Sequence, residues 1–201
     1  MVNGGLKKNF PALKRQPFFS PVWLAGIATL AGVAVLMLLG FAAWTYSRAE
    51  STTVIVVRHA EQDPSVAEDP PLSAVGAARS QQLAVLFGST TPPGKLTAIL
   101  SSPALRCRLT VAPLAAQLGL TPVVVPEAAD STAAAALARQ ILRDYDGGRV
   151  LIAAHGDAIP AIVSALSGRA DIPSIAVDEY GTLYVVTVPR LGTANLLRLH
   201  Y

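Results

Sequence analysis

Two of the three histidines in this 201-residue chain directly follow short apolar segments. His59 comes just after the β-branched run 54–57, and His155 comes directly after the apolar run 150–154. Both runs predict strands, and open parallel sheets bind ligands at the carboxyl ends of their strands. We therefore expect both imidazoles to face one crevice, whereas His200, close to the end of the sequence, is interpreted as structural.

Two arginines also lie close to the carboxyl ends of expected strands. Arg58 directly precedes the first of these histidines, and Arg106 falls in the first turn of a helix expected to start with Ser102 as its N-cap and Pro103 at its first position. Guanidinium groups bind phosphate through two parallel hydrogen bonds and keep their charge at any physiological pH. A helix N-terminus adds free N–H donors. The pattern predicts a phosphate site, with Arg108 interpreted as a solvated surface residue.

Strands and helices alternate along the rest of the chain. The expected strands are 54–57, 96–100, 123–125, 150–154, 183–188 and 196–199, and the expected helices are 72–87, 102–118, 130–146 and 158–166. Asp130 or Ser131 is the expected N-cap of the third helix. This alternation predicts an α/β fold with a mostly parallel sheet and helices on both faces.

Four motifs in this order resemble the histidine phosphatase superfamily, which has the phosphoglycerate-mutase-like fold. Residues 57–61 (Val-Arg-His-Ala-Glu) are similar to its Arg-His-Gly/Ala-Glu signature, and residues 72–79 to its Leu-Ser/Thr-x-x-Gly-x-x-Gln/Arg helix start. Residues 101–106 match its Ser-Ser-Pro-x-x-Arg element, and residues 154–156 match its second histidine turn. The implied fold agrees with the alternation of strands and helices.

The resemblance implies a phosphatase mechanism. His59 would be the nucleophile and become a phosphohistidine, while Arg58, Arg106 and His155 would surround the phosphoryl group. It also implies that neither a metal nor another cofactor takes part, because the arginines supply the positive charge. Phosphoryl transfer depends largely on such charge stabilisation.

The resemblance also calls for an acid that protonates the leaving oxygen. Glu127, just past the expected strand 123–125, fits the glutamate that follows the third strand in the mutase-like branch. Three alternatives stay open. Asp130 is close by but is expected to cap its helix, Asp157 follows the second histidine by two residues and is the natural N-cap of helix 158–166, and Glu61 belongs to the signature itself.

The chain departs from the family pattern in two places. Of the four residues that follow the signature, only Ser65 offers a hydroxyl for phosphate. The domain is also too short for the insertions that build sugar or phosphoglycerate sites. We therefore expect a small phosphatase with an open pocket, acting on a phosphorylated small molecule or an envelope component.

The N-terminal segment predicts a membrane span. Residues 16–47 carry no charge, and residues 22–44 are nearly continuous apolar sequence. As a helix of about 34 Å, the latter stretch could cross a hydrocarbon core of about 30 Å. Trp23 lies near one end, with Trp44 and Tyr46 near the other, where aromatic belts sit. A cleaved signal peptide is the alternative, but its apolar region is usually shorter.

Charge is distributed unevenly along the chain. The first 50 residues contain five basic residues and one acidic residue, whereas residues 51–201 contain 11 basic and 12 acidic. The basicity belongs to the tail, so nucleic-acid binding is not expected. Four basic residues precede the span and Arg48 follows it, which places the N-terminus in the cytoplasm.

The expected organisation is a cytoplasmic basic tail (1–21), a transmembrane signal anchor (22–46) and an extracytoplasmic phosphatase-like domain (47–201), periplasmic if the source is bacterial. The single cysteine, Cys107, excludes an intrachain disulfide and a Cys-rich zinc site. Two other functions stay open: a cytoplasm-facing phosphohistidine or phosphoprotein phosphatase, and an inactive relative that only binds phosphorylated ligands.

Overall fold

The computed structural model describes residues 21–47, 51–91 and 94–201. It divides into two compact units, with the boundary between Thr45 and Tyr46. In chain order the elements are α1 (Pro21–Ser47), β1 (Thr52–Arg58), α2 (Ala74–Phe87), β2 (Ala98–Ser101), α3 (Leu105–Leu118), β3 (Val123–Val124), α4 (Ser131–Asp144), β4 (Arg149–Ala154), α5 (Ile159–Ser167), β5 (Thr182–Val188) and β6 (Asn195–His200). The strands expected from the sequence are all present, with ends shifted by one or two residues.

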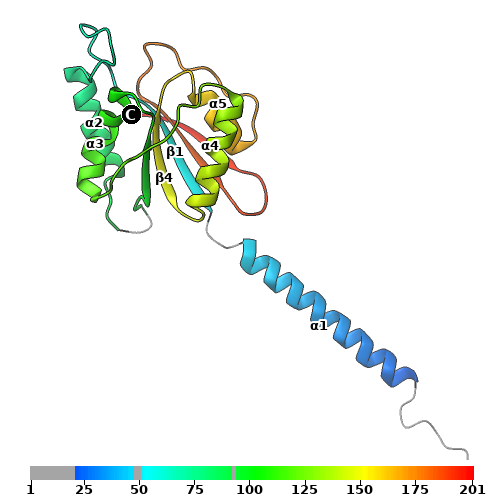
Figure 1. Cartoon of the computed structure of the whole chain (residues 1–201). Helices are drawn as coiled ribbons and strands as arrows, with labels where there is room; N and C mark the ends of the chain where they lie inside the picture. Colours follow the sequence, from blue (N-terminus) through cyan, green and yellow to red (C-terminus); the bar gives the residue numbers. More distant parts are fainter. Residues whose placement is uncertain (1–20, 48–50, 92–93) are drawn as a thin grey trace, which may run out of the picture. The chain divides into compact units, whose positions relative to one another are not determined.

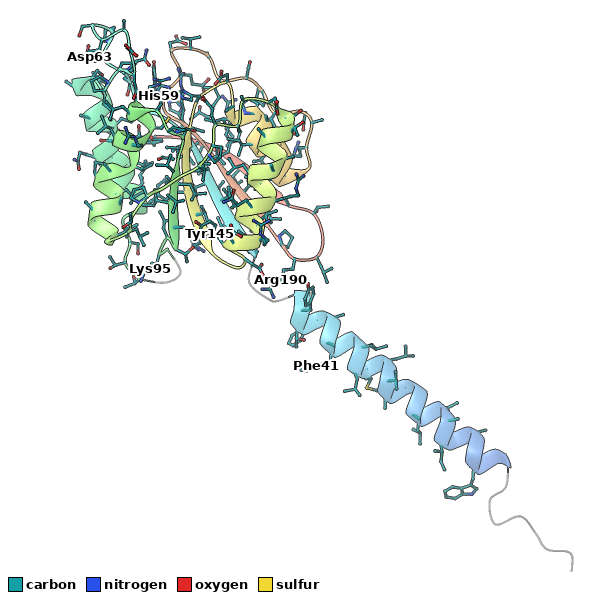
Figure 2. The ribbon with its side chains drawn as sticks, in the orientation of Figure 1. Phe41, His59, Asp63, Lys95, Tyr145 and Arg190 are labelled. Atoms are coloured by element: carbon teal, nitrogen blue, oxygen red, sulfur yellow. The ribbon has the colours of Figure 1, made fainter. Side chains whose placement is uncertain are left out.

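One six-stranded sheet, in the order β3-β2-β4-β1-β5-β6, forms the centre of the second unit. β1, β2, β3 and β4 pair in parallel, while β5 and β6 complete one edge in antiparallel fashion. The prediction of a mostly parallel α/β sheet is confirmed. Its carboxyl-terminal edge carries His59, whereas Lys95 and Tyr145 lie at the opposite end (Figure 2).

The two faces of the sheet are covered by different helices, as predicted. α2 and α3 lie on one face, and α4 and α5 lie on the other (Figure 1). Side chains of β1 alternate between them: Val54 and Val56 belong to the α4/α5 core, and Ile55 and Val57 to the α2/α3 core. Because both faces are buried, the strand is apolar at every position rather than at every second one.

The expected N-cap of α3 is wrong. Ser102 directly follows β2, where its backbone N–H donates to the carbonyl of Ala153 over 2.9 Å, and the helix begins only at Leu105. Asp69 takes over the capping instead: its Oδ1 accepts the N–H of Leu105 over 2.8 Å from 36 positions away. A carboxylate from another loop thus satisfies one of the free N–H groups of the first helical turn.

The expected capping role of Asp157 is wrong as well. α5 begins at Ile159, and no side chain caps it. The backbone carbonyl of His155 accepts the N–H groups of residues 158 and 159 over 3.1 and 3.2 Å, so the turn itself supplies the acceptor. The corresponding prediction for α4 is confirmed, because Asp130 Oδ1 accepts the N–H of Ala133 over 2.8 Å.

The described part of the first unit is formed by the long helix α1, whose last two residues lie past the unit boundary. Within it, Ala25–Tyr46 is the one segment of the described residues that is long and apolar enough to cross a membrane, and none of it is buried. Apolar side chains lie on all its faces, with Leu30 and Leu36 73% and 70% exposed. Such a helix is typical of a membrane span or of a signal sequence.

Candidate active site

The loop after β1 is fixed by backbone hydrogen bonds. The N–H of His59 donates to the carbonyl of Ala154 over 3.0 Å, which ties this loop to the end of β4. The next N–H, of Ala60, donates to Oγ1 of Thr110 on α3 over 2.8 Å. His59 is only 5% exposed. The nucleophile expected from the sequence therefore sits on a rigid, largely buried turn at the carboxyl edge of the sheet.

Glu61 holds the same loop from the other side. Its carboxylate receives hydrogen bonds from Nε and Nη2 of Arg79 on α2, over 2.9 and 2.7 Å. Burial acts to raise the pKa of Glu61, but the hydrogen bonds and charge of Arg79 outweigh it and hold that pKa below its usual value. Gly76 is required beneath this pair, since a Cβ there would lie 2.1 Å from the Glu61 carbonyl oxygen. Glu61 thus serves as a fixed carboxylate that anchors the loop.

The hydrogen bonds of His59 define its tautomer. Nδ1 lies 2.8 Å from the carbonyl oxygen of Ala60 and so carries the proton that it donates. Nε2 accepts the Nε–H of Arg106 over 3.3 Å. Burial lowers the pKa of His59 to about 4, with the charges of Arg106 and Arg58 acting in the same direction and the bond to the Ala60 carbonyl opposing. At neutral pH His59 is uncharged, and the lone pair on Nε2 accepts the hydrogen bond from Arg106.

His155 lies beside it at the end of β4. The two imidazole rings are 5.4 Å apart between centroids and meet edge to face. Arg106 Nη2 lies 3.1 Å from Nδ1 of His155, and Glu127 Oε1 lies 3.2 Å from its Nε2. Since an arginine can only donate, Nδ1 accepts and Nε2 carries the proton that faces Glu127. Burial and the charge of Arg106 lower the pKa of His155, against the charges of Glu127 and Asp157.

Arg58 is 7% exposed and is held by the segment before β5. Its Nη1 donates to the carbonyl oxygens of Ala176 and Glu179 over 2.7 and 2.9 Å. The ring of Tyr180 lies under its guanidinium, 4.1 Å from the guanidinium carbon, and 6.0 Å from the ring of His59. Its buried Nε has no hydrogen-bond partner within the described structure. The side chain of Arg58 is therefore held firmly through Nη1, while its Nε–H donates no hydrogen bond within the described structure.

A hollow of about 460 Å³ opens above these groups. Arg58, His59 and His155 form its inner part, and its outer walls consist of Gly156, Asp157, Pro160, Ser174, Ile175 and Val177. A smaller hollow of about 190 Å³ adjoins it, bordered by Glu127 and Asp157. A phosphoryl group in the inner part would meet the guanidinium of Arg58 and two imidazoles, both of which are in contact with Arg106.

The structure brings together five of the residues singled out in the sequence: Arg58, His59, Arg106, Glu127 and His155. It does not bring Ser65 to them, since that exposed hydroxyl donates to Asp63 Oδ1 over 2.7 Å. Arg108 is exposed, as predicted.

Sequence reasoning missed Tyr180 and Asp69, and neither has a local signal. Tyr180 reaches the site from the segment before β5, and Asp69 from the loop before α2. Asp69 also faces the site itself, because its Oδ1 lies 3.9 Å from Arg106 Nη1. Among the described residues, no three His, Cys, Asp or Glu side chains are grouped so as to hold a metal ion.

Residues 54–130 match the histidine phosphatase superfamily, branch 1. The matched residues include the first histidine motif and the helix that carries Arg106. The second histidine, His155, lies outside the matched range. The match agrees with the resemblance that the motifs of the chain bear to this superfamily. No match was found among curated proteins.

Solved structures share the fold over nearly their whole length. The structure of the protein histidine phosphatase SixA complexed with tungstate is 23% identical in sequence and superposes with a TM-score of 0.60. The match covers 74% of this chain and 96% of that chain. A mycobacterial glucosyl-3-phosphoglycerate phosphatase is 14% identical, with a TM-score of 0.59 and coverages of 76% and 99%. Phosphoserine phosphatase from Entamoeba histolytica, in complex with 3-phosphoglyceric acid, is 14% identical, with a TM-score of 0.58 and coverages of 75% and 97%.

Proposed function

We propose that this protein hydrolyses phosphomonoesters through a phosphohistidine intermediate on His59. The observation that carries the proposal is the state of His59: it is uncharged, its proton is on Nδ1, and the lone pair of Nε2 faces the guanidinium of Arg106. A nucleophile of this kind needs no separate base. The adjoining arginines are suited to the charge that develops on the phosphoryl oxygens.

In the first step, Nε2 of His59 attacks phosphorus and the bond from phosphorus to the ester oxygen breaks. Arg58 and Arg106 stabilise the equatorial oxygens. The leaving oxygen takes a proton from Glu127, which lies 3.2 Å from His155 at the edge of the site. The alcohol departs, and His59 carries the phosphoryl group.

In the second step, water attacks phosphorus and the bond between phosphorus and Nε2 breaks. Glu127, now a carboxylate, accepts the proton that the water loses. Inorganic phosphate leaves and His59 returns to its neutral form. The hydrogen bond from Nδ1 to the Ala60 carbonyl persists throughout and supports the transient positive charge on the ring.

The structural neighbours support hydrolysis rather than a particular substrate. Their names specify a phosphohistidine protein, a sugar phosphoglycerate and phosphoserine, which are different leaving groups on one fold. What they have in common is the phosphoryl group. The site described above is likewise built around that group.

We also propose that α1 anchors the enzyme in a membrane, with the catalytic domain on the extracytoplasmic side. In support, the segment Ala25–Tyr46 is unburied and apolar on every face. The basic residues Lys7, Lys8, Lys14 and Arg15 precede it. The positive-inside rule then assigns the N-terminus to the cytoplasm.

An assay of the full chain in detergent with 4-nitrophenyl phosphate tests the activity. We expect wild type to release phosphate and His59→Ala to lose activity by at least roughly 10³-fold, because no other group forms the intermediate. The matched control is His200→Ala, a histidine on β6 outside the site, which should keep most activity. Equal rates for wild type and His59→Ala would contradict the proposal.

A further inference from the structure

The mouth of the active site differs in chemistry from its interior. The cationic side chains lie deep: Arg58 is 7% exposed, and Arg106 lies against both imidazoles. No lysine and no other arginine lines the two adjoining hollows in the part of the chain that the structure describes. Positive charge is therefore concentrated where the phosphoryl group binds and does not extend to the rest of the substrate.

The groups around the mouth are acidic. Asp157 is exposed and borders both hollows, and Glu127 is 50% exposed beside it. Asp69, whose Oδ1 lies 3.9 Å from Nη1 of Arg106, adds a carboxylate beside that arginine. A second anionic group on the substrate, placed beyond the phosphoryl group, would meet the carboxylate of Asp157 without an available cation.

The remaining wall is apolar and fixed in place. Ile175 and Val177 line the main hollow, and Val177 is 85% exposed. Nη1 of Arg58 holds their segment through the carbonyl oxygens of Ala176, which lies between them, and of Glu179, two residues further on. The exposed side chain of Val177 offers apolar surface that a ligand can cover. Burying such surface stabilises a complex by about 25 cal/mol per Å².

We propose that the natural substrate is a phosphomonoester whose leaving group carries no negative charge and lays an apolar portion along Ile175 and Val177. This inference rests on the proposed phosphatase function. With the phosphoryl group beside Arg58, His59 and His155, the leaving group extends toward Asp157 and the apolar wall. Esters of carboxylated alcohols, such as phosphoglycerates, fit this mouth poorly.

Two matched esters test the charge preference with the full chain: hexyl phosphate and its analogue with a terminal carboxylate. We expect kcat/KM to be roughly fivefold lower for the carboxylate, the size of the repulsion between two like charges about 4 Å apart in bulk water. Asp157→Lys should reduce or invert that ratio. Asp144→Lys makes the same charge change at the end of α4, next to Tyr145 at the opposite end of the sheet (Figure 2), and should leave the ratio unaltered.

A second pair of variants tests the apolar wall. Val177→Asn, which removes the apolar surface without adding charge, should lower kcat/KM for hexyl phosphate several-fold while leaving inhibition by inorganic phosphate unchanged. Val85→Asn, at a valine on α2 that is 81% exposed, should alter neither. Equal kcat/KM values for the two esters in wild type would overturn this inference and leave the phosphatase proposal intact. Hydrolysis of neither ester would overturn both.

Discussion

The Nε–H of Arg106 donates to Nε2 of His59 across 3.3 Å, while the opposite ring nitrogen is bonded to the Ala60 carbonyl. The imidazole is thus fixed in one tautomer, with its lone pair directed at a cation. A phosphoryl oxygen that arrives at this guanidinium is brought next to the nucleophilic nitrogen. One arginine therefore orients the nucleophile and stabilises the group that it attacks.

This double role makes Arg106 a sensitive position. We expect Arg106→Ala to lower kcat/KM for 4-nitrophenyl phosphate by roughly 10²-fold or more, because loss of one charge-stabilising donor costs about 3 kcal/mol. Arg108→Ala is the control, since Arg108 is exposed two positions along the same helix. It should change little. Equal losses at both positions would contradict the placement of Arg106 in the site.

The second prediction concerns the protonation of His59. Its pKa is lowered to about 4, so the ring should stay neutral as pH falls from 8 to 5 and gain its proton only near pH 4. The measurement is NMR of ring-labelled full chain in micelles, with the His59 signal assigned from the His59→Ala spectrum. Titration near the ordinary value of 6.5 would show that burial does not dominate this site.

A control variant separates the causes of this shift. Arg106→Gln removes a positive charge that disfavours protonation while leaving His59 largely buried. The pKa of His59 should therefore rise relative to wild type, but stay below its usual value because burial is the larger cause. No change in that pKa would assign the shift to burial alone.

The third prediction treats Tyr180 as a positioning residue. Its ring lies 4.1 Å from the guanidinium carbon of Arg58, a cation–π contact worth about 2 kcal/mol where water is excluded. Tyr180→Ala should weaken inhibition by inorganic phosphate roughly tenfold, since Arg58 loses one of its restraints. Tyr180→Phe keeps the ring and should restore wild-type inhibition. If Phe behaves like Ala, the hydroxyl and not the ring face is responsible.

Much of the fold could be predicted because the signals were local. Strand β1 reads as four consecutive buried apolar residues, and the rule that ligands bind at carboxyl strand ends brings His59 and His155 together. Arg106 followed from its place in the first turn of a helix. Each of these inferences needs only a short window of sequence and a general rule of α/β architecture.

The errors and omissions arose from long-range contacts. Serine is a good capping residue, but the backbone N–H of Ser102 is hydrogen-bonded to the carbonyl of Ala153 at the end of β4. The N-terminus of α3 is capped instead by Asp69, which comes from another loop. At Asp157 the backbone carbonyl of a neighbour supplies the acceptor instead. Tyr180 reaches Arg58 across 122 positions of sequence, and no local pattern indicates which aromatic residue will do so.

The fourth prediction concerns topology. Alkaline phosphatase fused after Tyr201, which is active only outside the cytoplasm, should be active, because the basic residues before Ala25–Tyr46 favour a cytoplasmic N-terminus. The protein purified from membranes should also keep its full mass. An inactive fusion would favour a cytoplasm-facing phosphatase. Loss of roughly 50 residues would indicate a cleaved signal peptide.

The last prediction identifies the acid. An aryl phosphate leaves as a stabilised phenolate, whereas an alkyl phosphate leaves as an alkoxide that needs a proton in the transition state. Glu127→Gln should therefore lower kcat for hexyl phosphate by roughly 10²-fold or more and affect 4-nitrophenyl phosphate far less. The 3.2 Å contact between Glu127 and His155 puts this carboxyl at the edge of the phosphoryl site.

The competing carboxyl groups are tested by the same two substrates. Asp157→Asn should keep most activity on both substrates, because Glu127 remains as the proton donor. The substitution should not disturb α5 either, since the Asp157 side chain does not cap that helix. Asp130 is occupied at the N-cap of α4, and Glu61 is held by Arg79 with a lowered pKa, which makes it a poor proton donor. If Asp157→Asn gives the substrate-dependent loss and Glu127→Gln does not, the acid is Asp157. If neither variant shows it, the leaving group takes its proton from water or from one of the two occupied carboxyls.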